Sequence, residues 1–235
     1  MFTSIDSRVR YSEADESDCL SVKGVFDYLQ DCCTFQSEDA GQGVEALQKQ
    51  HRAWILAGWH LKFNRLPAMG EQIRAFTWPH RFREYFAYRC HSIESPDGEL
   101  MVIGNSEWIF VDTESGRPKK VPQEQKDIYT LEKRIDMPFR NRRIVCKGDF
   151  EEGESFTIRR HQIDTNGHTN NAQYVAMAAD CLPEGFAFNE IRVEYRHEAV
   201  LGDLVIPRIY KGDDKIAVEL IPEEGKAFAA VEFIR

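Results

Sequence analysis

The stretch HQIDTNGHTNNAQYVAMAADC, residues 161–181, has a counterpart earlier in the chain, and the pair decides the fold. Laid over YSEADESDCLSVKGVFDYLQDC, residues 11–32, it aligns without gaps at an offset of 149 residues (164 minus 15), so that Asp15 meets Asp164. Both copies continue into apolar residues at helical spacing. The same register superimposes two candidate N-cap residues, Ser21 and Asn170. The sequence therefore predicts an internal duplication in which each half contains a loop followed by a helix.

A second repeat follows each predicted helix. WHLKFNRLPAMGEQIRAF (59–76) matches IRVEYRHEAVLGDLVIPRI (191–209), with Gly70 on Gly202 at an offset of 132 residues (202 minus 70). Apolar and polar residues alternate on both sides of these glycines, as they do in strands that flank a turn. Later hairpin signals in each half are Asp97-Gly98 and Glu224-Gly225. Each half is thus expected to be an α+β unit, a helix laid on a curved antiparallel sheet.

Composition and charge exclude several classes of protein. The 235 residues are 42% hydrophobic and 29% charged, which is typical of a globular protein with a packed core. No run approaches the roughly 20 apolar residues of a membrane helix, and the first residues lack the order of a signal peptide, so we expect a cytoplasmic protein that does not enter a membrane. The six cysteines form no C-x-x-C, which favours reduced thiols. The net charge of -9 argues against nucleic acid as a partner.

One basic segment interrupts this acidic chain. The region 121–147 has no counterpart in the second half, and its part KRIDMPFRNRRIVCK (133–147) carries six basic residues against one acid. We therefore predict an N-terminal domain over 1–120, a basic linker over 121–147 and a C-terminal domain over 148–235. The basic run is interpreted either as a solvated connector or as a docking patch for an acidic partner.

Three reactive groups occur in only one of the two copies. Under the two offsets Asn166 falls on Ser17, His168 on Cys19 and Glu198 on Leu66. Asp164, by contrast, is matched by Asp15 and is interpreted as structural. The second half is therefore the expected site of chemistry.

The placement of these groups suits attack on an ester or thioester carbonyl. A helix N-terminus favours a developing negative charge. The Asn166 carboxamide and backbone N–H groups of residues 167–171 are candidate donors to an oxyanion. Glu198 can take a proton from water, and His168 can orient that water or protonate the leaving thiolate. The non-catalytic alternatives are a turn in which Asp164 and Asn166 only hydrogen bond to their own backbone, and an exposed strand carboxylate at Glu198.

The motif D-x-N-x-H-x-N-N at 164–171, followed by E-Y-R-H-E at 194–198, resembles the acyl-acyl-carrier-protein thioesterases. The resemblance covers essentially the whole chain. It implies an α+β fold of two tandem hotdog domains, each a long helix wrapped by a curved antiparallel sheet. It also implies hydrolysis of fatty acyl carrier-protein thioesters to free fatty acid and carrier thiol, with the acylated carrier protein as partner and the N-terminal domain binding the acyl chain.

The resemblance also assigns the site residues. The catalytic set carried over from the family is Asp164, Asn166, His168 and Glu198. The expected substrate-binding residues are Trp54, Trp59, Phe63, Asn170 and Asn171. The expected docking residues for the acidic carrier are Arg140, Arg142 and Arg143. Plant members of the family carry a Cys directly after the catalytic Glu, and here Ala199 stands there, which leaves water activation by Glu198 as the simpler chemistry. Plant members also carry a transit peptide, and its lack here suits a bacterial type.

Other functions stay open beside this one. A hydrolase of coenzyme A thioesters would use the same groups without the basic run, and hotdog folds also serve dehydratases. A non-catalytic acyl-thioester sensor would need an output module, for which no residues are left. No metal or organic cofactor is expected, since there is no H-E-x-x-H motif and no glycine-rich phosphate loop. The spacing of the motifs does not encode the preferred length of the acyl chain or the oligomeric state. A homodimer is one alternative.

Overall fold

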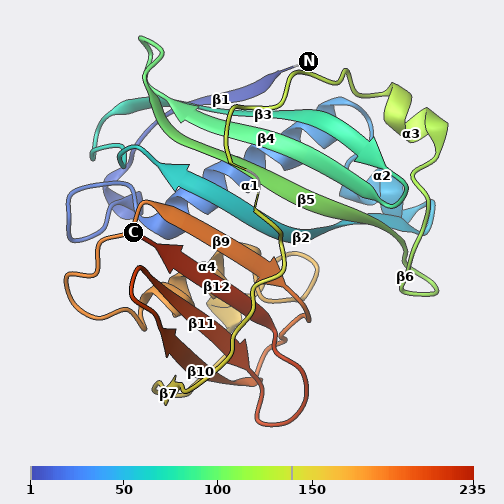
Figure 1. The fold of residues 1–235 in the computed structure, drawn as a ribbon. Coiled ribbons are helices and arrows are strands. Elements are labelled where there is room, and N and C mark those ends of the chain that lie inside the picture. Colours follow the sequence, from blue (N-terminus) through green and yellow to red (C-terminus); the bar gives the residue numbers. More distant parts are fainter. Residues whose placement is uncertain (1, 139) are drawn as a thin grey trace. The chain divides into compact units, whose positions relative to one another are not determined.

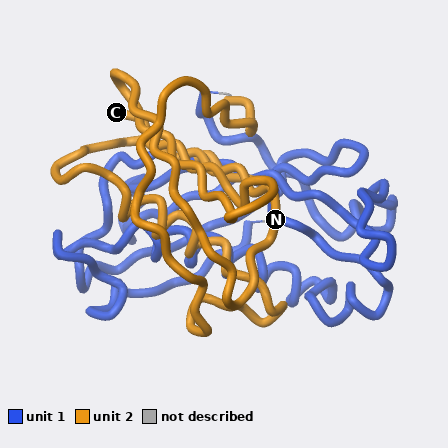
Figure 2. The backbone as a smooth tube through the Cα atoms, turned by 90° about the horizontal axis from the view of Figure 1, so that it is seen from below, with its two compact units in different colours: residues 1–57, 61–139 blue, residues 58–60, 140–235 orange. Residues whose placement is uncertain are grey.

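The structure, a computed structural model, describes residues 2–138 and 140–235 and divides into two compact units (Figures 1 and 2). Unit 1 consists of Met1–Ala57 and Leu61–Phe139, and unit 2 of Gly58–His60 and Arg140–Arg235. Met1, in the predicted N-terminal domain, and Phe139, in the predicted linker, lie outside the described residues. The segment expected to form the linker is shared between the two units.

Unit 1 is built from one antiparallel sheet and a long helix (Figure 1). In chain order its elements are β1 (Thr3–Arg8), η1 (Tyr11–Glu13), α1 (Val22–Asp39), α2 (Val44–Gln48), β2 (Arg52–Phe63), β3 (Gln72–Arg83), β4 (Phe86–Glu94), β5 (Leu100–Asp112), β6 (Arg117–Pro118) and α3 (Gln123–Asp127). The strands lie in the order β1-β3-β4-β5-β2, and β6 pairs with β5. Helix α1 packs on β1, β3 and β4.

Helix α1 forms where the sequence predicts it. The Ser21 side chain accepts a hydrogen bond from the Gly24 N–H, which satisfies one of the unpaired donors of the first turn. The buried side chains recur every three or four residues and face the sheet: Val25, Phe26, Leu29, Cys32 and Cys33. The opposite face, with Lys23 and Asp27 paired at 2.5 Å, is partly open to water.

Unit 2 repeats the plan with a shorter helix. Its elements are β7 (Glu151–Glu152), β8 (Phe156–Thr157), η2 (Arg160–Gln162), α4 (Asn171–Ala179), β9 (Glu190–Tyr195), β10 (Leu204–Lys211), β11 (Lys215–Ile221) and β12 (Ala229–Ile234). The strand order is β9-β12-β11-β10-β7, β8 pairs with β10, and α4 packs on β11 and β12. Helix α4 has 9 residues against 18 in α1. Pro183 follows shortly after its end, and a proline cannot continue a helix.

Backbone hydrogen bonds confirm the duplication at both predicted offsets. In unit 1 the Leu20 N–H donates to the Pro67 carbonyl at 2.8 Å, and in unit 2 the Thr169 N–H donates to the Ala199 carbonyl at 2.8 Å. Thr169 is 149 positions after Leu20, and Ala199 is 132 positions after Pro67. One contact thus joins the first repeat to the second repeat in each unit, in the same place.

The core of each unit is apolar. Among the largest fully buried side chains are Phe110 in unit 1 and Phe233 in unit 2. None of the helices in the described part of the chain is long and apolar enough to cross a membrane.

Candidate active site

A tight loop before α4 carries Asp164, Asn166 and His168. The Asp164 carboxylate accepts the N–H of Asn166 at 2.8 Å and that of His168 at 3.3 Å. The Asp164 N–H in turn donates to the His168 carbonyl at 2.8 Å, which closes the loop. Gly167 adopts φ +82°, a left-handed conformation that costs glycine little. The carboxylate of Asp164 therefore shapes the loop that presents the other two side chains.

The equivalent loop of unit 1 has the same frame. Asp15 accepts the N–H of Ser17 at 2.9 Å, and its own N–H donates to the Cys19 carbonyl at 2.9 Å. Asp18 stands at the position of Gly167 and also has a positive φ, +57°. This agreement supports the interpretation of the shared aspartate as structural.

The structure brings His168 and Glu198 together. Nε2 of His168 lies 3.4 Å from Oε2 of Glu198, and the two side chains are 39% and 57% exposed. Both groups can therefore contact each other and water or a substrate. Asn166 is also exposed, and its Nδ2 lies 3.5 Å from Oδ2 of Asp164, too long for a strong hydrogen bond. Its carboxamide is only weakly tethered and is accessible as a donor.

Most of the expected backbone donors are already used inside unit 2. The N–H of Gly167 donates to the Asp164 carbonyl, that of His168 to the Asp164 carboxylate, that of Thr169 to the Ala199 carbonyl and that of Asn170 to the Gln162 carbonyl. Binding of an oxyanion by these N–H groups stays a prediction, and the Asn166 side chain is a candidate donor that none of these four hydrogen bonds engages.

The two asparagines at the start of α4 have clear structural roles. The Asn170 side chain accepts the Ala172 N–H at 2.9 Å and so caps the helix as predicted. The Asn171 carbonyl accepts the Tyr195 hydroxyl at 3.0 Å. A contact of either with substrate stays a prediction.

The three aromatic residues expected to bind substrate are buried or partly buried. Trp54 packs against a cluster of Leu47, Phe110 and Val121, with its ring centroid 4.8 Å from that of Phe110. Phe63 is buried in unit 1, and Trp59, which groups with unit 2, is buried too. These positions fit a core role, and lining of an acyl tunnel stays a prediction.

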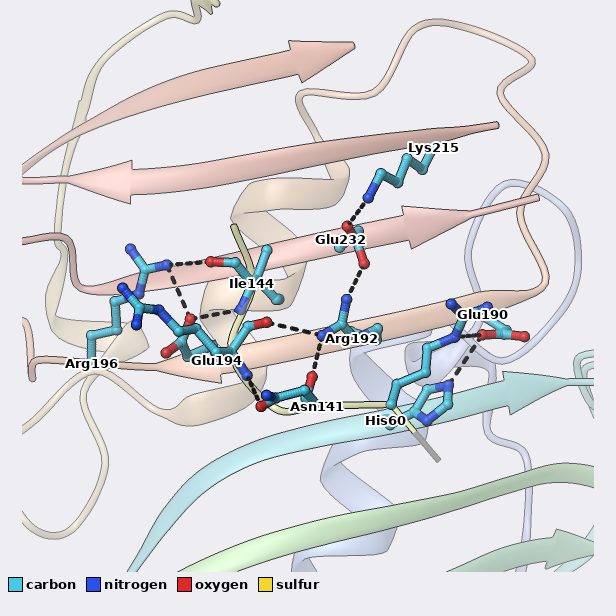
Figure 3. Close-up of polar contacts among 11 residues, drawn as sticks. His60, Asn141, Ile144, Glu190, Arg192, Glu194, Arg196, Lys215 and Glu232 are labelled. Atoms are coloured by element: carbon cyan, nitrogen blue, oxygen red, sulfur yellow. Dashed lines mark hydrogen bonds and ion pairs between the residues drawn. The ribbon is translucent and has the colours of Figure 1, made fainter. Parts of the chain in front are cut away.

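The basic segment is partly tied down within unit 2 (Figure 3). Arg192, on β9, donates to the carbonyls of Asn141 and, at 3.1 Å, of Arg143. Glu194 accepts the Ile144 N–H at 2.9 Å. Residues 141–144 are thus attached along β9 and do not form a free connector.

The three arginines expected to dock a carrier differ in their surroundings. Arg140 Nε lies 2.8 Å from Oε2 of Glu190, which also lies 3.1 Å from Nε2 of His60. Burial raises the pKa of the Glu190 carboxyl, but the hydrogen bonds from His60 and Arg140 outweigh it and hold this pKa below its usual range. The charge of Arg140 is therefore balanced locally. Arg142 is partly buried, and Arg143 is exposed.

Unit 2 also has an open hollow of about 780 Å³. Its lining includes His197, Asp203, Lys226 and Phe228, whereas Asn166, His168 and Glu198 are not among the lining residues. Within residues 2–138 and 140–235 no group of three or more His, Cys, Asp and Glu side chains is arranged to hold a metal ion.

Two residues of the site were not predicted. Tyr174 and Thr169 hydrogen bond to the peptide groups of Ala199, next to Glu198. A signal for Tyr174 was present in the aligned copies, since it falls on Val25 and so places a hydroxyl where the first helix has a methyl group.

Comparisons with known proteins agree with this architecture. The acyl-ACP thioesterase N-terminal domain family matches residues 3–129, and the C-terminal domain family matches residues 147–231. The crystal structure of an acyl-ACP thioesterase from Bacteroides thetaiotaomicron superposes with a TM-score of 0.91 at 18% identity, covering 99% of this chain and 97% of that one. A 12:0-ACP thioesterase from Umbellularia californica gives a TM-score of 0.84 at 17% identity, covering 99% and 96%. The two units therefore define a double-hotdog protein, which confirms the predicted fold class.

A curated relative gives the same family. The chain is 23% identical over 218 residues to oleoyl-acyl carrier protein thioesterase 1 of Arabidopsis thaliana, a chloroplastic protein, and the match covers 84% of this chain. The chain spans 60% of the length of that relative. The protein belongs to the acyl-ACP thioesterase family, as the motif at 164–171 predicts.

Proposed function

We propose that this protein hydrolyses fatty acyl-acyl-carrier-protein thioesters to free fatty acid and carrier thiol, by water activated in unit 2. Family membership supports the reaction class. The 3.4 Å contact between His168 and Glu198 is the observation that supports this site. It joins two side chains from different repeats, and the equivalent positions of unit 1 have neither an imidazole nor a carboxylate.

The proposed chemistry needs no covalent intermediate. Glu198 takes a proton from a water molecule while the oxygen of that water bonds to the thioester carbonyl carbon. The carbonyl oxygen becomes an oxyanion, which the Asn166 carboxamide stabilises. When the C–S bond breaks, the sulfur leaves as a thiolate and receives, through His168, the proton that Glu198 took from water, so both side chains return to their starting states. Asp164 holds the loop in shape throughout.

The remaining assignments are part of the same proposal. The N-terminal domain, 1–120, binds the acyl chain with Trp54 and Phe63, and the C-terminal domain, 148–235, carries out the chemistry. An acylated carrier protein is the partner, and the location is cytoplasmic. Arg140, Arg142 and Arg143 are the proposed docking residues for the acidic carrier, and Arg143, which is exposed, is the one best placed for a test.

Purified protein mixed with an acyl-carrier substrate is expected to release free thiol, measured with a thiol-reactive chromophore. The same reaction mixture distinguishes the dehydratase alternative, because an enoyl product absorbs in the ultraviolet and a hydrolysis product does not. Enoyl absorbance without thiol release would show that the reaction is dehydration and not hydrolysis.

Neutralising Arg143 distinguishes a carrier-protein substrate from a coenzyme A substrate. Arg143→Gln is expected to raise KM for the acyl-carrier substrate by about threefold, the effect of one exposed charge pair, and to leave KM for the coenzyme A ester unchanged. Lys226→Gln, which removes an exposed charge from the β11–β12 hairpin, is the matched control. An equal rise of KM for both substrates would contradict docking at this segment.

A further inference from the structure

We propose that Tyr174 and Thr169 are positioning residues that hold Glu198 against His168 by fixing both peptide groups of the neighbouring Ala199. The inference rests on the proposed function, in which Glu198 is the base. Tyr174 lies on the buried face of α4, and Thr169 lies just before that helix.

The contacts form a closed ring around one residue. The Ala199 N–H donates to the Tyr174 hydroxyl at 2.8 Å, and the Thr169 hydroxyl donates to the Ala199 carbonyl at 3.0 Å. The Tyr174 and Thr169 hydroxyls also hydrogen bond to each other. Each hydroxyl has one proton, and the Thr169 hydroxyl donates its proton to the Ala199 carbonyl. Tyr174 is therefore the donor in its hydrogen bond with Thr169. Every member of the ring is thereby satisfied.

Burial makes this ring rigid. Ala199 is 0% exposed, Tyr174 3% and Thr169 4%, so water does not compete for these hydrogen bonds. Burial also raises the pKa of the Tyr174 hydroxyl, and its hydrogen bonds with the Ala199 N–H and the Thr169 hydroxyl do not reverse this rise. Tyr174 therefore keeps its proton, which the ring requires.

The fold itself does not require the ring. The equivalent positions in unit 1 are Leu20, Val25 and Pro67, which have no hydroxyl between them and, at Pro67, no N–H. The backbone hydrogen bond from Leu20 to Pro67 nevertheless forms at 2.8 Å, the same length as its counterpart in unit 2. The hydroxyl ring is an addition to the half that carries Glu198 and His168.

The ring restrains the backbone next to Glu198 and so helps to fix the position of its side chain. Glu198 itself is 57% exposed and makes one 3.4 Å contact, with His168, so its own side chain is weakly held. Fixing the next peptide unit restricts the backbone from which that side chain projects. A shift of about 1 Å in a reacting group can lower a rate by about 10²-fold.

The test is a double-mutant cycle on thioester hydrolysis with the full chain. Tyr174→Phe is expected to lower kcat about 10- to 100-fold with KM within about twofold of the wild-type value. In the Glu198→Ala background the same substitution is expected to leave the residual rate within about twofold, because the group that it positions is gone. Tyr28→Phe is the matched control, since this buried tyrosine of α1 hydrogen bonds to Ser7 and Glu13, and its kcat should not change.

A second pair of variants covers a failure of Tyr174→Phe to fold. Thr169→Val removes the ring hydroxyl and should lower kcat, whereas Thr169→Ser keeps the hydroxyl and should restore it.

Two results overturn the positioning role: full activity of Tyr174→Phe or Thr169→Val, or a loss from Tyr174→Phe that is as large in the Glu198→Ala background as in the wild type. The failure of the proposed function has a different signature. It would show as full activity of Glu198→Ala itself.

Discussion

Glu198→Ala is expected to lower kcat for thioester hydrolysis by about 10²–10⁴-fold, with little change in KM, because it removes the group that takes the proton from water. The carboxylate is exposed and touches His168, so its removal creates neither a cavity nor a buried unpaired charge. The measurement is steady-state thiol release, with thermal unfolding as a check that the variant folds.

Two further variants make this result specific. Glu198→Gln keeps the size and hydrogen-bonding capacity of the side chain but cannot accept a proton, so it should be as inactive as Glu198→Ala. Glu223→Ala removes another carboxylate of unit 2 and should keep wild-type kcat. Substantial activity in Glu198→Gln would mean that Glu198 orients water and does not take its proton.

His168→Gln is expected to lower kcat by about 10²–10⁴-fold when the leaving group is an alkyl thiol such as the carrier's. Glutamine can still hydrogen bond near Glu198, so the loss reports the missing proton donor. A thioester of an acidic aryl thiol needs less protonation as it leaves, and the loss with that substrate should be clearly smaller. Both rates are measured by thiol release.

The control for this substitution is next to the site. His197→Gln changes the exposed histidine that precedes Glu198 and should keep full activity with both thioesters. If His168→Gln lost the same factor with the aryl and the alkyl leaving groups, protonation of the leaving thiolate would not be its role.

The fold was predictable because the chain repeats itself. The two offsets of 149 and 132 residues located both loops, and Ser21 and Asn170 cap the helices as predicted. The length of α4 was less accessible, since apolar spacing marks a helix but does not fix where it ends. The groups from different repeats, His168 and Glu198, were paired from the motif, and the structure places them in contact.

Other features depend on three-dimensional contacts that spacing cannot encode. The loop N–H groups were expected to face a substrate, and in the structure those of residues 167–170 donate to Asp164, to Gln162 and to the distant Ala199. The hydrogen bonds from β9 to the backbone of residues 141–144 join segments about fifty positions apart, and charge counting along the sequence does not reveal them. The ring at Ala199 likewise exists only when α4 lies beside the chain that follows β9.

The frame shared by the two loops has a consequence for how such proteins diversify. Asp15 and Asp164 impose one conformation, and Asp18 adopts a positive φ where the other loop has Gly167, so the backbone is indifferent to whether Asn and His or Ser and Cys project from it. After a gene duplication, side-chain substitutions can therefore change the chemistry of one loop while its backbone conformation is kept.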